Sequence, residues 1–143
     1  MKYNLFVFIL LKFFVNSFNI YVLQLVSNKF YIGKTCKSVS ERFNTHKKGS
    51  GAEWTKIYKP ILVLEQFESN DKFDEDKYTK KYMDKFGIDN VRGGSYSSVR
   101  LEDWQIKAIE HELKSCNDLC FNCGKYGHFA SECHKYNKKK IYF

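Results

Sequence analysis

The stretch from Asn19 to His46, NIYVLQLVSNKFYIGKTCKSVSERFNTH, decides how this chain folds. Within it, Ile20–Leu25 and Lys29–Ile32 are short runs rich in Ile, Val, Tyr and Phe, separated by three residues of turn composition. This pattern predicts a β-hairpin. Because side chains alternate across a strand, Tyr21 and Tyr31 can point to the same face of the two paired strands.

The segment that follows the hairpin carries the signature of a helix start. Ser38 and Glu41 have the spacing of a capping box, in which the Ser38 side chain accepts from the third helical N–H and Glu41 reaches back. Arg42 and His46 come next at positions i and i+4, so both lie on one face of that helix. Two phenols, a guanidinium and an imidazole would gather here, which is more polar chemistry than a hydrophobic core needs.

Two triplets give this region a family resemblance. Asn19-Ile20-Tyr21 and Tyr31-Ile32-Gly33 stand at the separation found in the GIY-YIG endonucleases, followed by the Lys34-Thr35 often seen there. The chain departs from the pattern where Asn19 replaces the first Gly. The resemblance extends over residues 19–96 and implies an α/β fold, with a small, mainly antiparallel three-stranded sheet flanked by helices.

The resemblance also implies a set of catalytic positions. In this sequence they are Tyr21, Tyr31, Arg42, His46, Glu75 and Asn90. Glu75 would hold one divalent cation, Mg²⁺ or Mn²⁺, and Arg42 would neutralise charge on the transition state. The phenol of Tyr31 or Tyr21, assisted by His46, would activate the attacking water.

Two further features of the implied site stay open. Asp74 and Asp76 flank Glu75 and could replace it as the metal ligand if the register were shifted by one residue. Asn90 follows the same helix and would brace the site rather than react. The sequence does not decide which group takes the proton from water.

Periodicity predicts three more elements in the central part of the chain. A third strand is expected over Ile61–Phe67, entered through the single proline, and helices over Asp71–Phe86 and Leu101–Lys114. Gly87 would end the first of these helices, and Ile88–Ser98 is expected to be a loop. The expected apolar contacts of the two helices are Phe73, Tyr78, Tyr82, Phe86, Leu101, Trp104, Ile106, Ile109 and Leu113.

A second motif lies near the C-terminus. Cys120, Cys123, His128 and Cys133 have the spacing Cys-x2-Cys-x4-His-x4-Cys. Three thiolates and one imidazole complete a tetrahedral Zn²⁺ shell with no open position, so this zinc would be structural. The segment resembles the zinc knuckle of nucleocapsid proteins. Reduced thiols also favour an intracellular, reducing compartment.

Charge and aromatic residues favour a nucleic acid as the partner. The formal net charge is +8, and a basic balance attracts polyanions. Stacking on bases is expected for the aromatic residues of the knuckle, and phosphate contacts for the lysines around both motifs. The predicted nucleic-acid-binding residues are Lys34, Lys47, Lys48, Phe121, Lys125 and Phe129.

The first 18 residues do not belong to either motif. They contain an apolar run interrupted by Lys12, which is compatible with an extra packed element, a signal peptide or a membrane anchor. A membrane is not the expected partner, and the oligomeric state stays open. The predicted organisation is an apolar extension over 1–18, a nuclease domain over 19–98, an accessory helix over 99–116, a knuckle over 117–134 and a basic tail over 135–143.

The function that these features predict is metal-dependent hydrolysis of phosphodiester bonds in DNA rather than RNA, with the knuckle helping to bind the nucleic acid. The alternative is a catalytically inactive nucleic-acid-binding or scaffold protein built on the same domain. A membrane-tethered adaptor is a third hypothesis, and it rests only on the apolar run.

Overall fold

The computed structural model describes residues 17–137, so the N-terminal apolar run and the lysines at 138–140 lie outside the described residues. The strands are β1 Phe18–Leu25, β2 Lys29–Thr35, β3 Pro60–Ser69 and β4 Val91–Gly93. The helices are α1 Val39–Lys47, α2 Glu53–Ile57, α3 Asp74–Phe86, α4 Asp103–Cys116 and α5 His134–Asn137. Short 3-10 turns lie at Val26–Asn28, Ile88–Asn90 and Ala130–Glu132.

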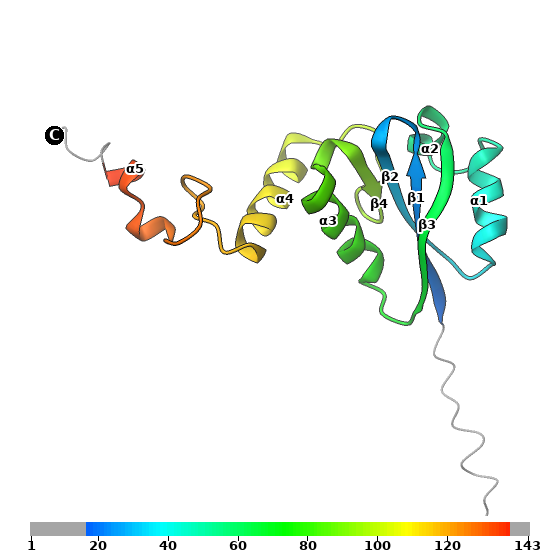
Figure 1. Cartoon of the computed structure of the whole chain (residues 1–143), viewed down its shortest axis with the longest axis horizontal. Coiled ribbons are helices and arrows are strands. Elements are labelled where there is room, and N and C mark those ends of the chain that lie inside the picture. The colour runs from blue at the N-terminus through cyan, green and yellow to red at the C-terminus, as the bar shows by residue number, and fades with distance from the viewer. Residues whose placement is uncertain (1–16, 138–143) are drawn as a thin grey trace, which may run out of the picture.

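The α/β fold class is confirmed, but the sheet has four strands instead of three. Their order is β3-β1-β2-β4 (Figure 1). The predicted hairpin of β1 and β2 is antiparallel, and β3 pairs antiparallel with the other side of β1. The fourth strand, β4, pairs parallel with β2, so the sheet is mixed.

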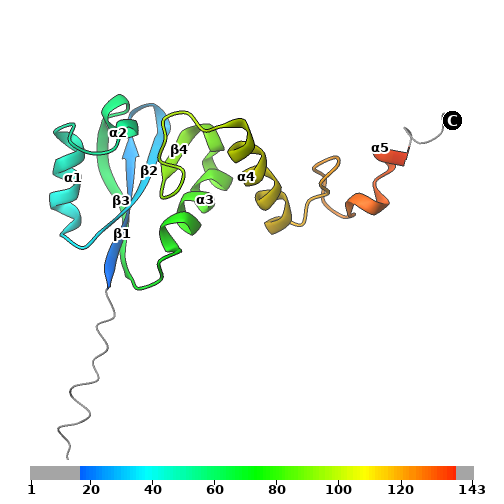
Figure 2. The same cartoon turned by 180° about the vertical axis from the view of Figure 1, so that it is seen from behind.

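The central strands β1 and β2 are buried on both faces, whereas the edge strand β3 is largely exposed. Ile20, Val22 and Ile32 pack with α3 and α4, whereas Tyr21 and Leu23 pack on the side of α1 and α2. Figure 2 shows these two layers from behind, with α1 and α2 on one side of the sheet and α3 and α4 on the other. This explains why β1 is an almost continuous apolar run, because alternate residues enter two different cores.

The missed strand β4 forms where the sequence predicted a loop. It is only three residues long and includes Arg92, so neither length nor hydrophobicity predicts a strand. Arg92 is nevertheless buried, because its guanidinium donates to the backbone carbonyls of Ile88, Val91, Ser98 and Val99 and lies over the Trp54 ring. Buried charge is tolerated where every N–H finds an acceptor.

Helix α3 differs from the prediction in its start and in its buried face. It begins at Asp74 and ends before Gly87, as expected for the C-terminus. The residues facing the sheet are Thr79, Tyr82 and Met83, whereas Phe73 is 66% exposed and was wrongly expected in the core. The hydroxyl of Thr79 is satisfied by the carbonyl of Glu75, which permits its burial.

Helix α4 is attached firmly to α3. Ile109 enters the core that α3 shares with the sheet, and Lys80 pairs with Glu112 at 2.5 Å. At the end of α4, the Asn117 amide donates to Asp84 on α3 at 2.9 Å. The expected apolar contact of Trp104 is wrong, since its side chain is 69% exposed.

The described segment contains no helix that is both long enough and apolar enough to cross a membrane. The signal-peptide and anchor hypotheses concern residues 1–18, nearly all of which lie outside that segment.

Candidate nuclease site and zinc centre

The two tyrosines of the hairpin share one face of the sheet, as predicted. Tyr21 lies directly opposite Gly33 in the pairing of β1 and β2, and the rings of Tyr21 and Tyr31 are 6.5 Å apart. A Cβ on Gly33 would collide with the phenol of Tyr21. The glycine of the second triplet therefore allows the Tyr21 ring to lie across the backbone of β2. Asn19 has no comparable constraint, since it stands in the extended backbone of β1.

His46 on α1 is fully buried beside these tyrosines. Its Nε2 lies 3.0 Å from the Tyr21 hydroxyl, and its Nδ1 lies 2.8 Å from the Thr55 hydroxyl of α2. Thr55 donates its single hydroxyl proton to the carbonyl of Ala52, so it accepts from Nδ1–H of His46. Nε2 then carries the lone pair and accepts the proton of Tyr21, because the partner of one ring nitrogen fixes the tautomer.

The surroundings of His46 keep the imidazole neutral. Burial, together with the positive charge of Arg42, lowers the pKa of His46 to about 4. A Cβ on Gly51 would collide with the imidazole ring, so the glycine-rich turn after α1 provides the space for it. The sequence motif indicated His46. Thr55 and Gly51 belong to no motif, and their contacts with His46 follow only from where the fold brings them.

Arg42 completes this cluster from the same face of α1. Its Nε donates to the Tyr21 hydroxyl at 3.3 Å. Burial raises the pKa of both Tyr21 and Tyr31, while Arg42 lowers both. In the protein alone the burial effect is larger, so both phenols keep their protons at neutral pH.

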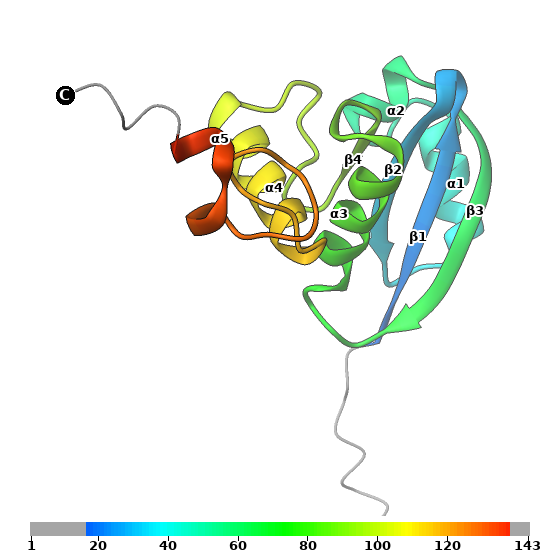
Figure 3. The ribbon, with the colours of Figure 1, turned by 60° about the vertical axis from the view of Figure 1, so that its left-hand side comes forward.

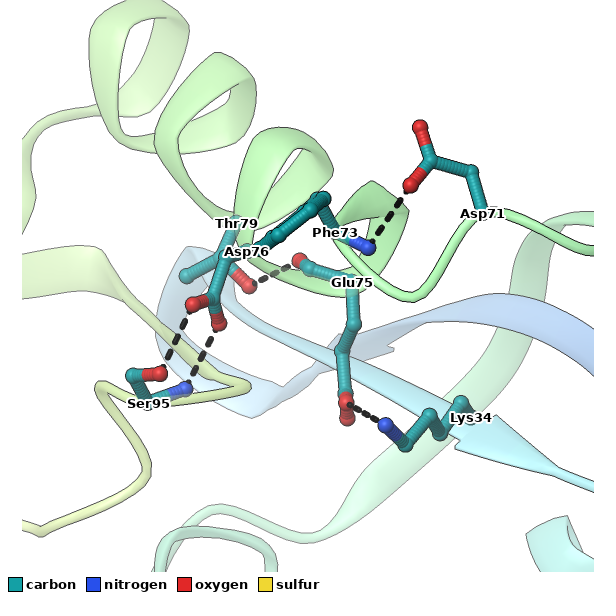
Figure 4. Close-up of polar contacts among 7 residues, drawn as sticks. All are labelled: Lys34, Asp71, Phe73, Glu75, Asp76, Thr79 and Ser95. Carbon is teal, nitrogen blue, oxygen red and sulfur yellow. Dashed lines mark hydrogen bonds and ion pairs between the residues drawn. The ribbon is translucent and has the colours of Figure 1, made fainter.

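Glu75 reaches the same site from the first turn of α3. Its carboxylate lies 3.5 Å from the Lys34 ammonium on β2, and Figure 4 shows the side chain extending away from α3 toward that lysine. Burial raises the pKa of Glu75, while Lys34 lowers it. The negative charge of Glu75 also contributes to the raised pKa of Tyr21 and Tyr31, so the carboxylate lies within electrostatic range of both.

The neighbouring acids are engaged elsewhere. Asp76 accepts from the N–H and the hydroxyl of Ser95, both at 2.7 Å, and so holds the loop after β4 (Figure 4). Asp74 accepts from the Ser69 hydroxyl at 2.6 Å. Of the three acids, Glu75 is thus the one whose charge acts on the tyrosines.

The donor set at Glu75 fits a hard divalent cation. A single, partly exposed carboxylate is the usual protein contribution to a Mg²⁺ or Mn²⁺ site, because Mg²⁺ keeps several of its own waters. Lys34 is half exposed, and its contacts are the ion pair with Glu75 and the face of the Phe18 ring, so it can move aside when a cation takes its place.

Three other predicted residues lie apart from this cluster. Asn90 follows the far end of α3 from Glu75, a helix of about 20 Å, where it accepts from Lys29 at 2.7 Å and donates to the Phe86 carbonyl at 2.6 Å. It joins the end of α3 to the start of β2, and its bracing of the site stays a prediction. Lys47 and Lys48 are exposed at the C-terminus of α1.

The four predicted zinc ligands come together in the C-terminal module. One ligand atom from each of Cys120, Cys123, His128 and Cys133 lies within 4.8 Å of the others. Donors of a tetrahedral zinc with metal–ligand bonds of about 2.0–2.3 Å are separated by roughly 3.5–4 Å, so this arrangement fits the ion. Since all four donors are protein atoms, a bound zinc would be structural.

The residues predicted to bind nucleic acid in this module are not equivalent. Lys125 and Phe129 are exposed, as expected. Phe121 instead stacks on the ring of His111 in α4, with centroids 4.2 Å apart and an interplanar angle of 4°. Figure 3 views the chain with the knuckle in front of α4, and Figure 1 shows that the knuckle extends beyond the C-terminal end of that helix.

Comparison with known proteins identifies the same two modules. The family model described as "GIY-YIG catalytic domain" matches residues 17–88, and the one described as "Zinc knuckle" matches residues 118–135. The chain belongs to the GIY-YIG family, a family of nucleases, and carries a zinc knuckle in addition.

Two curated relatives are similar to the nuclease part. A "UPF0213 protein" of Limosilactobacillus reuteri is 34% identical over 83 residues, covering 52% of this chain and 85% of the relative. A "UPF0213 protein" of Pediococcus pentosaceus is 39% identical over 57 residues, covering 40% of this chain and 58% of the relative. No solved structure matches the chain.

Proposed function

We propose that this protein is a divalent-metal-dependent endonuclease that hydrolyses phosphodiester bonds of DNA at the hairpin–helix site. The observation that carries the proposal is the buried series of hydrogen bonds from Tyr21 through His46 to Thr55, which fixes a single tautomer of His46. A purely structural core does not need a neutral imidazole whose free lone pair is aimed at a phenol. Membership in a nuclease family supports the same conclusion.

Tyr21 and His46 form the proton pathway of the proposed reaction. Tyr21 passes its hydroxyl proton to Nε2 of His46 while its oxygen takes a proton from the attacking water. The water oxygen forms a bond to phosphorus, and the bond from phosphorus to the leaving sugar oxygen breaks. The raised pKa of Tyr21 makes a preformed phenolate unfavourable, and the lowered pKa of His46 makes it a weak acceptor in the protein alone. The negative charge of a bound phosphate, which favours the imidazolium, is therefore what promotes the transfer from Tyr21 to His46.

Arg42 and Glu75 stabilise the charge of the reacting phosphate. Arg42 already donates to Tyr21 and can offer its remaining N–H groups to a phosphate oxygen, with the largest benefit where charge develops in the transition state. Glu75 would hold the divalent cation. When bound, that cation supplies Lewis-acid polarisation of the phosphate and stabilises the leaving oxygen.

The knuckle directs the nuclease to DNA with single-stranded character, such as flaps, branches or nicked duplex. Its exposed aromatic rings and the net charge of +8 suit unpaired strands. Three thiols must stay reduced to bind zinc, which supports the proposal that the protein works in a reducing compartment.

Cleavage of duplex, single-stranded, flap and four-way DNA with Mg²⁺ or Mn²⁺ tests this function. Glu75→Gln keeps the shape of the side chain but removes the charge, so the rate should fall by about 1000-fold, equivalent to several kcal/mol of lost stabilisation. Glu110→Gln, an exposed acid on α4, is the matched control and should cut normally. Normal cutting by Glu75→Gln, or no cutting by the unaltered protein on any substrate, would contradict the proposal.

A further inference from the structure

One aromatic ring of the knuckle is already occupied within the chain. Phe121 lies parallel to the imidazole of His111, and 40% of the residue is exposed. A base that used this face of Phe121 would first have to separate the two rings. Stacked aromatic pairs are stabilising beyond the area they bury, so this separation opposes binding.

Two other aromatic rings of the knuckle are far more accessible. Tyr126 is 76% exposed and Phe129 is 68% exposed. Both line a groove of about 380 Å³ on the surface of the module. The residues that line the groove are Asp118, Tyr126, Gly127, His128, Phe129 and Glu132.

We propose that Phe121 docks the knuckle onto α4, and that an unstacked base of a single-stranded nucleic acid binds in the groove lined by Tyr126 and Phe129. The proposal rests on the nucleic-acid-binding part of the function proposed above. It assigns base stacking to Tyr126 and Phe129, and it assigns Phe121 to packing against α4 instead of to base stacking.

The composition of the groove indicates which part of a nucleic acid enters. Ring faces stack on any base at about 1–3 kcal/mol per base. The carboxylates of Asp118 and Glu132 repel phosphate but accept hydrogen bonds from the amino groups of bases. The backbone of the strand would therefore run outside the groove, where Lys125 and Lys135 are exposed.

Docking through Phe121 fixes where this groove lies relative to the nuclease site. The knuckle follows α4 after a short turn, in which the N–H of Leu119 donates to the Lys114 carbonyl at 2.8 Å. Helix α4 is in turn joined to α3, the helix that carries Glu75, through the Lys80–Glu112 pair. The His111–Phe121 stack is the side-chain contact that completes this connection.

Binding of a short, fluorescently labelled single-stranded DNA of mixed sequence to the zinc-loaded full chain tests the assignment. Tyr126→Ala and Phe129→Ala should each raise Kd by about 5- to 100-fold. Phe121→Ala should change Kd by less than about threefold. Zinc content, measured for every variant, shows that the knuckle is still folded.

The opposite ranking would overturn the proposal. If Phe121→Ala weakens binding as much as Phe129→Ala while both retain zinc, Phe121 is the platform. The titration is run without added Mg²⁺ or Mn²⁺, so binding is measured separately from the proposed cleavage. If the protein binds DNA but does not cut it, the proposed nuclease function is wrong, whereas the assignment of the base platform still stands.

The ring protons of His111 report on docking directly. A parallel aromatic partner shifts them upfield, and we expect that shift to persist when DNA saturates the protein. His111→Phe should keep the knuckle docked, whereas His111→Ala should release it. If DNA moves the His111 signals to the positions they have in Phe121→Ala, a base has displaced the imidazole and the proposal is wrong.

Discussion

The nuclease domain and the knuckle hold their polar side chains in place in opposite ways. In the domain, His46 and Thr55 are fully buried between a hydrophobic sheet and two helices. In residues 117–135 the buried residues are Cys120 and Cys133, and both are zinc ligands. The domain thus positions its polar groups by packing, whereas the knuckle has no core apart from its metal site.

This contrast shows how much each module can do without a metal. Across the described chain, no buried side-chain nitrogen or oxygen lacks a hydrogen-bond partner. The nuclease site is therefore preorganised by protein groups, and its cation would add chemistry rather than structure. The knuckle needs its ion in order to exist as a folded unit.

Removal of zinc is the largest expected perturbation. Binding of zinc to such peptides is worth about 10–16 kcal/mol, and this energy is the folding energy of the module. Treatment of the chain with a chelator, or the change Cys120→Ser/Cys133→Ser, should unfold residues 117–135 and leave the sheet domain intact. Residue-resolved NMR would show this directly. Unfolding of the sheet domain under the same treatment would mean that the two modules are not independent.

The buried Arg92 should give the next largest effect, confined to the nuclease domain. Arg92→Met leaves four backbone carbonyls without this donor, at about 1–3 kcal/mol each, so the free energy of unfolding should fall by roughly 4 kcal/mol or more. Denaturant unfolding measures this. Arg100→Met, at an exposed position, is the control and should change stability little. Equal effects of the two changes would refute the structural role of Arg92.

The buried His46 makes the stability of the domain depend on pH. Its native pKa of about 4 lies below the usual 6.5, so between these values the unfolded chain binds a proton that the folded one does not. Above pH 6.5 protonation of His46 does not reduce the free energy of unfolding. That free energy should fall by about 3 kcal/mol as the pH drops to 4. In His46→Gln this part of the pH dependence should disappear.

The fluorescence of Trp54 provides a probe for that experiment. Since the chain has two tryptophans, Trp104→Phe leaves the buried Trp54 as the single reporter of the sheet domain. Measurement in the Cys120→Ser/Cys133→Ser background excludes proton-driven loss of zinc. A pH profile that is the same with and without His46 would show that the imidazole is not the responsible group.

Thr55 should give the smallest effect on stability but a clear effect on catalysis. Thr55→Val keeps the shape and leaves Nδ1–H of His46 without an acceptor, which should cost about 1–3 kcal/mol. The change also removes the bond that holds His46 in the tautomer that accepts from Tyr21. The cleavage rate should therefore fall by more than the loss of folded protein explains. Thr45→Val, a helix-surface hydroxyl bonded to the Glu41 carbonyl, is the control. An unchanged cleavage rate in Thr55→Val would remove Thr55 from the site.

Several features could be predicted because they are local. The hairpin, the start of α1 at Ser38 and the end of α3 at Gly87 follow from turn and capping residues within a few positions. The capping bond from the Glu41 N–H to the Ser38 hydroxyl is present at 3.3 Å. The zinc ligands are also local, since their spacing alone brings them together.

Other features could not be predicted because they depend on distant partners. Strand β4 exists through its pairing with β2, and Arg92 is buried because carbonyls on both sides of it converge on one guanidinium. The exposure of Phe73 and Trp104 was missed for a related reason. Helical periodicity shows which residues share a face but not where the covered surface ends.

The sequence by itself determined the family, the hairpin with its two tyrosines, and the ligand set of the knuckle, because these are encoded by residue type at short spacing. Only the tertiary structure decided that Glu75, rather than Asp74 or Asp76, is the acid whose charge acts on the tyrosines, and that Thr55 fixes the tautomer of His46. It also decided that Phe121 packs on His111. These outcomes depend on which side chains meet across separate elements, and that is fixed by the packing of the whole chain.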